Sequence, residues 1–134
     1  MSGNKTFTII KPDAFKSGYS GPIIKMIEDA GFSLKNMRLV RLDQESAGKF
    51  YAVHEDKPFF GRLCDYMCSG SIIVIELEKE NAVEDFRKLM GATNPENAEE
   101  GTIRKLYATS IEANAIHGSD SDENAEIEIN FFFS

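Results

Sequence analysis

The sequence predicts an α+β fold in a single domain that spans residues 1–134. Short segments rich in β-branched and aromatic residues alternate with segments whose apolar residues recur every three or four positions, as strands and helices require. With 134 residues, 42% of them hydrophobic, the chain is long enough to bury a core without disulfides or a structural metal. An antiparallel sheet covered by helices is the expected architecture.

The first part of the chain is predicted to form a strand, a helix and a second strand. These segments are residues 6–10, about 23–30 and about 33–42. Pro12 ends the first strand, Asp13 can begin a turn or a helix, and Gly31 stops the helix. Lys11 is consequently expected at the carboxyl end of a strand.

The rest of the chain is predicted to repeat this order after an inserted pair of helices. The expected elements are short helices at about 44–53 and 60–68, a strand at 72–77, a helix at about 82–89, a strand at 115–117 and a helix at about 122–131. Residues 72–77 are almost continuously apolar, which is typical of a central strand covered on at least one face. The order indicates a ferredoxin-like βαββαβ fold, with four antiparallel strands and the helices on one face.

The connection from residue 91 to residue 114 is long and lacks a clear helical or strand period. Connections of this length inside a compact domain are usually functional or disordered. Hydroxyl, guanidinium and glycine residues in it suit an anion, namely Thr93, Gly101, Thr102 and Arg104. We therefore expect a functional loop.

The charge of the chain limits the kind of partner. A net charge of −7 argues against a nucleic-acid-binding surface, because such a surface needs a basic stripe to displace counterions. An anionic ligand must instead be held by a local group of cations. The candidates are Lys11, Arg62, Arg87, Lys88, Arg104 and Lys105.

Cysteines and hydropathy set further expectations. Cys64 and Cys68 are four residues apart in a predicted helix, which favours two small core residues over a disulfide. A zinc site would also need His54 and His117, and this spacing is a weak signal, so no protein-held metal is expected. The start of the chain has no apolar leader, and no apolar run approaches the ~18 residues of a membrane span. A cytoplasmic protein with no membrane partner is expected.

His117 is the candidate nucleophile. It ends a short apolar segment and is followed by glycine, hydroxyl and acidic residues. A neutral imidazole has a free lone pair and can attack phosphorus without a separate base. Gly118 would leave the ring face uncrowded, and Ser119, Asp120 or Glu128 can hold the second ring nitrogen. Ser119, Asp120 and Ser121 are also good N-caps, and Asp120 with Glu123 makes a capping-box-like pair, so the segment alone leaves both interpretations open.

Several runs in order resemble one family over essentially the whole chain. They are Thr8-Ile9-Ile10-Lys11-Pro12-Asp13-Ala14, Phe50-Tyr51-Ala52-Val53-His54, Lys57-Pro58-Phe59-Phe60, Met90-Gly91-Ala92-Thr93-Asn94-Pro95, Gly101-Thr102-Ile103-Arg104 and Asn114-Ala115-Ile116-His117-Gly118-Ser119-Asp120-Ser121. The chain thus resembles the nucleoside diphosphate kinases. The resemblance implies transfer of the terminal phosphate of a nucleoside triphosphate to a nucleoside diphosphate, in a ping-pong reaction through a phosphohistidine.

The same resemblance implies the site residues. The catalytic residues are His117 as nucleophile, Ser119 and Glu128 orienting its ring, and Lys11. Lys11, Tyr51, Arg87, Thr93 and Arg104 surround the phosphates, Asn114 and Lys11 reach the sugar, and Phe59 stacks on the base. Mg²⁺ travels with the nucleotide, and homo-oligomers, either tetramers or hexamers, are the habit of the family. Tyr51 and Asn114 also fit hydrogen-bonded polar residues near the site, Phe59 fits ordinary core, and His54 is interpreted as structural.

The chain departs from the family pattern at Glu100, where many members have proline before Gly-Thr-Ile-Arg, and many members continue beyond Ser134.

Two other classes of function remain open. A ferredoxin-like RNA-binding module would need aromatic residues on its central strands, yet residues 72–75 are aliphatic. A phosphohistidine carrier that passes phosphate to proteins would keep its phosphate when diphosphates are offered.

Overall fold

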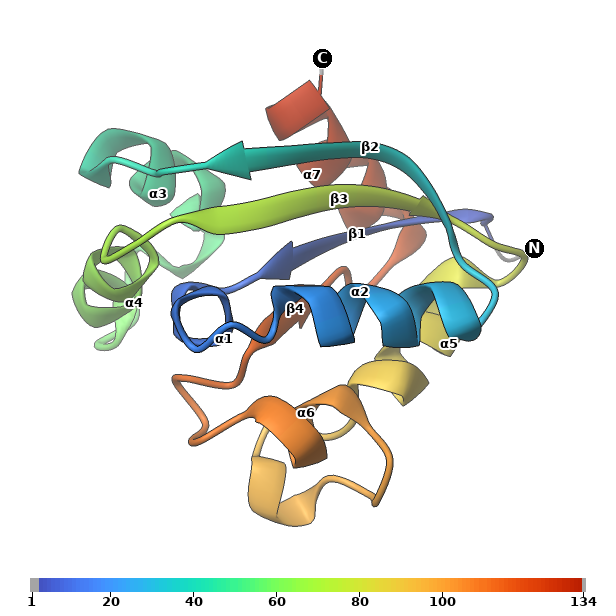
Figure 1. Ribbon diagram of the computed structural model, residues 1–134. Helices are drawn as coiled ribbons and strands as arrows, with labels where there is room; N and C mark the ends of the chain where they lie inside the picture. The colour runs from blue at the N-terminus through green and yellow to red at the C-terminus, as the bar shows by residue number, and fades with distance from the viewer. Residues whose placement is uncertain (1–2, 134) are drawn as a thin grey trace.

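The computed structural model describes residues 3–133 and contains a four-stranded antiparallel sheet in the order β2-β3-β1-β4 (Figure 1). The strands are β1 (Lys5–Ile10), β2 (Ser33–Val40), β3 (Ile72–Glu78) and β4 (Ile116–Gly118). The helices are α1 (Pro12–Lys16), α2 (Ser20–Asp29), α3 (Gln44–Phe50), α4 (Phe60–Met67), α5 (Ala82–Met90), α6 (Ile103–Tyr107) and α7 (Asp122–Phe133), with 3₁₀ turns η1 (Ala52–His54) and η2 (Pro95–Asn97). This confirms the ferredoxin-like α+β class and the order of the elements.

The register of the sheet places the candidate nucleophile beside a central strand. In the antiparallel pair of β1 and β4, Ile9 lies opposite His117. On its other side β1 pairs with β3, where Ile9 lies opposite Val74. His117 is therefore carried by a short edge strand, β4, whose pairing with β1 fixes the backbone of His117 beside a central strand of the sheet.

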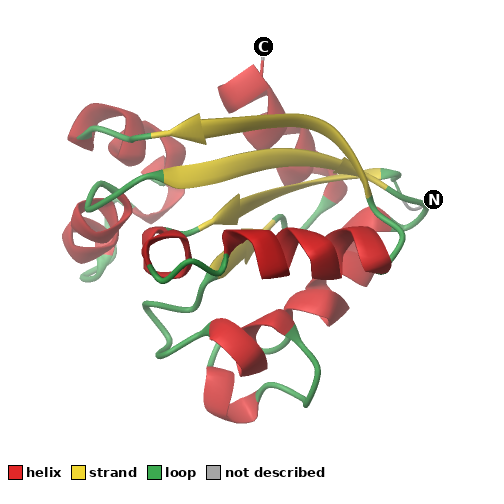
Figure 2. Ribbon diagram, in the orientation of Figure 1, coloured by secondary structure: helices red, strands yellow, loops and turns green. Residues whose placement is uncertain are grey.

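Helices cover both faces of the sheet, so the expectation that they lie on one face is wrong (Figure 2). Phe7 and Ile9 of β1 pack with residues of α3, α4 and α7. Ile10 of β1 and Ile75 of β3 pack with residues of α2 and α5 on the other face. Because β1 and β3 carry apolar side chains on both faces, each face needs its own layer of helices to exclude water.

The long connection from residue 91 to residue 114 contains secondary structure that its sequence did not indicate. Thr102 caps α6 by accepting a hydrogen bond at Oγ1 from the Lys105 amide at 3.3 Å, and Ile103 is fully buried. Gly91 precedes this segment with φ +86°, and a Cβ there would lie 2.5 Å from Thr102 Oγ1. A five-residue helix is too short to show a hydrophobic period. Only its N-cap Thr102 and the preceding Gly91 are sequence signals that could have indicated it.

Candidate functional site

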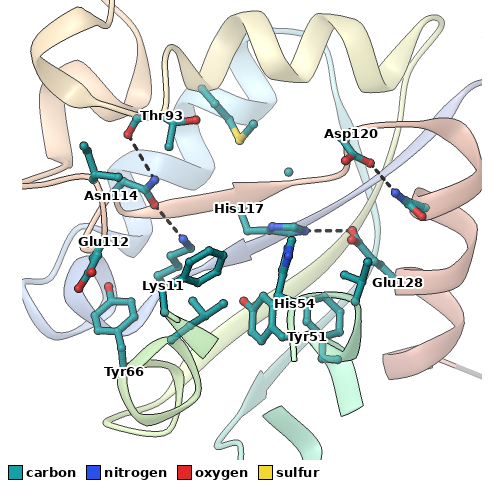
Figure 3. Close-up of a pocket in the computed structure, with 18 of the residues that line it drawn as sticks. Lys11, Tyr51, His54, Tyr66, Thr93, Glu112, Asn114, His117, Asp120 and Glu128 are labelled. Atoms are coloured by element: carbon teal, nitrogen blue, oxygen red, sulfur yellow. Dashed lines mark hydrogen bonds and ion pairs between the residues drawn. The ribbon is translucent and has the colours of Figure 1, made fainter. Parts of the chain in front are cut away.

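A cleft of about 930 Å³ opens above the ends of β1 and β4 (Figure 3). All but one of the predicted site residues line it, namely Lys11, Tyr51, Phe59, Arg87, Thr93, Arg104, Asn114, His117 and Glu128. The exception is Ser119, which is buried and contacts Glu128 instead. Residues separated by more than one hundred positions thus meet in one cavity.

The imidazole of His117 is oriented by a carboxylate. Its Nε2 lies 3.0 Å from Glu128 Oε1, and Ser119 Oγ donates to the same oxygen at 2.7 Å. Ser119 is itself held by β1, since the Phe7 amide donates to its Oγ at 3.3 Å. With a proton on Nε2 shared with the carboxylate, the lone pair of the neutral ring resides on Nδ1. Ser119 therefore acts on the ring through Glu128.

One other expectation about this segment is corrected. Asp120 is not the residue that holds the ring, because its Oδ1 accepts from Asn124 Nδ2 at 2.6 Å. Ser121 is the cap of α7, accepting from the Asn124 amide at 3.0 Å. Gly118 also has a packing role: a Cβ there would lie 2.7 Å from Met90 Cε, so glycine is needed for close packing of β4 on α5.

Lysines and arginines line the cleft, and of these Arg104 is buried and Lys11 is partly buried. Lys11 Nζ donates to Asn114 Oδ1 at 2.8 Å, and burial together with the charge of Arg104 lowers the pKa of Lys11 to about 8. Burial and the charge of Arg87 lower the pKa of Arg104 to about 10. Because these positive charges repel each other where water is largely excluded, a polyanion bound between them would be stabilised.

Arg104 is fixed by backbone carbonyls. Its Nη1 donates to the Gly91 carbonyl at 3.1 Å and its Nη2 to the Ile116 carbonyl at 2.8 Å. Its Nε is buried and finds no hydrogen-bond partner among residues 3–133. The guanidinium therefore links the long connection to β4, and these two bonds leave the Nε–H and the second N–H of each Nη nitrogen without a use.

The polypeptide enters β4 through a strained turn that the sequence did not reveal. Ala115 is fully buried and has φ +74°, and the Ile116 amide donates to the Asn114 carbonyl at 2.9 Å across it. This is a γ-turn of the rare, strained kind. The Lys11 amide donates to the Ala115 carbonyl at 2.9 Å, and the Ala115 amide donates to Asp13 Oδ2 at 3.1 Å. Asp13 had been considered only as the start of a turn or helix.

The outer end of the cleft has an aromatic and charged rim. Phe59 is 38% exposed, which separates it from ordinary core residues, and its ring lies 5.6 Å from that of His54. Arg62 Nη2 lies 2.7 Å from Glu112 Oε1 across the mouth. Sequence reasoning had singled out Arg62 only as one cation among several and had missed Glu112.

Tyr51 lies deeper in the cleft and has a buried hydroxyl. Burial raises the pKa of this phenol far above its ordinary value, so the group stays protonated. The hydroxyl has no hydrogen-bond partner within residues 3–133. Tyr51 thus lines the cleft with a buried hydroxyl that has no hydrogen-bond partner among these residues.

Within residues 3–133, no group of three or more histidine, cysteine or acidic side chains is placed to hold a metal ion. Cys64 and Cys68 are both free thiols, and Cys64 lies on the buried face of α4. None of the helices formed by these residues is both long and apolar enough to cross a membrane.

Known proteins that are similar to the whole chain share one description. The family model "Nucleoside diphosphate kinase" matches residues 4–134. A nucleoside diphosphate kinase of Flavobacterium psychrophilum is 57% identical over 134 residues, which cover 100% of this chain and 96% of the relative. One of Pelobacter propionicus is 53% identical over 130 residues, covering 97% and 95%.

Solved structures agree with these relatives. The Aquifex aeolicus nucleoside diphosphate kinase superposes with a TM-score of 0.97 at 39% identity, covering 99% of this chain and 96% of that one. The halophilic enzyme of Halobacterium salinarum, solved in complex with CDP, has a TM-score of 0.93 at 38% identity, covering 98% and 88%. The similarity therefore extends over sequence and fold together.

Proposed function

The chain belongs to the nucleoside diphosphate kinase family and is an enzyme that transfers phosphate between nucleotides, and on this premise we propose that His117 carries the phosphoryl group between donor and acceptor. The terminal phosphate of a nucleoside triphosphate moves to Nδ1 of His117, and the diphosphate leaves. A second nucleoside diphosphate then enters the same cleft and removes the phosphate. One site thus serves both half-reactions, which gives ping-pong kinetics.

The observation that carries this proposal is the contact between His117 Nε2 and Glu128 Oε1 at 3.0 Å. It assigns the proton of the neutral ring to Nε2 and the nucleophilic lone pair to Nδ1. When Nδ1 bonds to phosphorus, the ring acquires positive charge, and the adjacent carboxylate stabilises that charge. Ser119 supports this by holding the carboxylate in place, since its Oγ donates to the same oxygen at 2.7 Å.

The cations of the cleft are proposed to bind the phosphates. Phosphoryl transfer needs positioning and positive charge on the equatorial oxygens of the transferred group, and little covalent chemistry from the protein. Lys11, Arg87 and Arg104 supply the charge, while Thr93 and Tyr51 supply hydroxyl donors. Because Arg104 is fixed by two carbonyls, its free donors are organised before the substrate arrives.

The outer end of the cleft is proposed to bind the nucleoside. Phe59 offers an aromatic face to any base, so stacking there binds without selecting the base edge. Asn114, already bonded to Lys11, is placed to reach the sugar together with that lysine. The Halobacterium salinarum relative was solved with CDP, which supports a nucleoside diphosphate as the ligand of this fold.

Nucleotide kinases generally need a divalent metal, and we propose Mg²⁺ bound with the nucleotide. The side chains fit a metal held by phosphate oxygens, because the cleft offers cations where the phosphates would lie. The nearby carboxylates of Glu128 and Asp120 are engaged by His117 and Asn124. Mg²⁺ would neutralise part of the phosphate charge. A homo-oligomer, tetramer or hexamer, in the cytoplasm completes the proposal.

The test is a two-step labelling experiment. The protein is incubated with ATP labelled in the terminal phosphate, freed of nucleotide, and then offered a mixture of nucleoside diphosphates. The proposal expects label on the protein and then its passage to several different diphosphates. A phosphohistidine carrier that serves proteins would keep its label, and that result would overturn the proposed function.

A further inference from the structure

The entry to β4 depends on a side chain outside the residues assigned above. We propose that Asp13 is a positioning residue for the reaction: its carboxylate fixes the strained turn at Ala115, and thereby Asn114 and His117, while it offsets positive charge at Lys11. This inference rests on the proposed function and deepens it. Asp13 lies behind the wall of the cleft, in the first turn of α1.

The Asp13 carboxylate joins two elements that the chain places far apart. Its Oδ2 accepts from the Ala115 amide at 3.1 Å, and its Oδ1 accepts from the Tyr66 hydroxyl of α4. The Tyr66 oxygen in turn accepts from the Asp13 amide at 3.4 Å. Tyr66 lines the cleft whereas Ala115 is fully buried, so the carboxylate fastens the floor of the cleft to its α4 side.

The turn held by Asp13 would not persist without such contacts. An alanine at φ +74° occupies a sparsely populated region, and such residues persist only where their surroundings determine them. The Ala115 amide is buried, and Asp13 is its acceptor. Removing the carboxylate would leave a buried donor unsatisfied beside a strained residue, and the turn could relax. Asn114 and His117 flank this residue, so both would move with it.

The same carboxylate acts on the charge of Lys11. Burial and Arg104 lower the pKa of Lys11, whereas Asp13 opposes them by attraction. The other titratable groups that line the same cleft are Lys49, Tyr51, His54, Arg62, Tyr66, Arg87, Arg104, Glu112, His117, Asp120 and Glu128. Among the charges that act on Lys11, Asp13 is the one that favours the protonated amine, the form that suits a polyanionic substrate.

Three variants separate the two effects. Asp13→Ala removes both the acceptor and the charge. Asp13→Asn keeps an oxygen for the Ala115 amide, loses the charge, and replaces the oxygen that accepts from Tyr66 with an NH2 group. Tyr66→Phe keeps the carboxylate and its bond to Ala115. Asp29→Asn is the control, because Asp29 is exposed on α2 and pairs only with Lys25 among the described contacts.

For Asp13→Ala we expect kcat to fall by about 10-fold or more, as misplacement of reacting groups does, and KM to rise at pH 7 because Asn114, proposed to reach the sugar, moves with the turn. Asp13→Asn should recover kcat at that pH, but its kcat/KM should fall with rising pH from a midpoint roughly half a pH unit or more below that of the wild type. Tyr66→Phe should retain most of both values, and Asp29→Asn should match the wild type.

Two results would overturn the inference. An Asp13→Ala protein with reduced thermal stability and unchanged kcat would assign Asp13 a purely structural role. An Asp13→Asn protein with the wild-type pH profile would remove its action on Lys11, and this variant keeps the test decisive even if Asp13→Ala does not fold. Failure of the proposed function is distinguishable, because it would show as a wild-type protein that forms no phosphoenzyme.

Discussion

Replacing Glu128 with alanine should slow the formation of the phosphoenzyme far more than it weakens nucleotide binding. Glu128 Oε1 accepts from His117 Nε2 at 3.0 Å and from Ser119 Oγ at 2.7 Å. A hydrogen bond to a charged group contributes about 1.5–3 kcal/mol. If that stabilisation is realised on the charged ring of the transition state, its loss corresponds to about 10- to 150-fold in rate. KM should change little, because Glu128 contacts the nucleophile and not the nucleotide.

Ser119 supplies an internal check on this reasoning. Ser119→Ala alone should slow the reaction by less than Glu128→Ala, since the carboxylate stays and loses only its support. In the Glu128→Ala background the same change should have almost no further effect, because Ser119 acts through the missing carboxylate. The assay is single-turnover labelling of the protein by ATP.

The matched control is Glu126→Ala, which removes an exposed carboxylate from the same helix α7. It should leave the labelling rate within about twofold, since surface changes away from special contacts are nearly neutral. A Glu128→Ala protein slowed less than threefold would refute the reasoning. Equal effects of Ser119→Ala in both backgrounds would also refute it.

Three further predictions concern the cations and the long connection. Arg87→Ala and Arg104→Ala should each lower kcat/KM by about 10²-fold, and effects under threefold for both would contradict the assignment. Only Arg104→Ala should also lower the melting temperature in a thermal unfolding scan, because it alone leaves two backbone carbonyls without their donor. Because the pKa of Lys11 is lowered to about 8, the free enzyme loses this charge as pH rises through that value and kcat/KM should fall there, a decline that Lys11→Met should lack in a pH titration of activity. Glu100 is exposed and lies outside the residues that line the cleft, so Glu100→Gln should leave nucleotide affinity nearly unchanged in a binding titration, and a tenfold gain would show that this carboxylate faces the phosphates.

Much of the sheet could be predicted because its signals are local. Residues 72–77 have the length and apolar content of a central strand, and the observed strand β3 includes all of them. The placement of helices on both faces could not be predicted, because a continuous apolar run indicates burial but does not say which element covers each side. The 3₁₀ turn η2 and the helix α6 were not predicted, because each is too short to show a period.

The site also contains residues that the sequence could reveal and residues that it could not. His117 and Arg104 could be recognised because a histidine or an arginine next to glycine and threonine or serine residues is typical of an anion site. The γ-turn at Ala115 leaves no trace in residue type, since its strain is imposed by Asp13 and Lys11 from the other end of the chain. The packing role of Gly118 could not be predicted, because its contact with Met90 depends on how β4 packs against α5.

The central claim is that His117 carries the phosphate, and labelling of His117→Ala tests it most directly. The variant and the wild type are incubated with ATP labelled in the terminal phosphate, and acid-labile phosphate on each protein is measured beside a circular dichroism spectrum. The imidazole is a reactant at the edge of the cleft, so the variant should keep its fold and take up no label, while the wild type becomes labelled. Acid-labile phosphate on the folded His117→Ala protein at the wild-type level would place the nucleophile elsewhere.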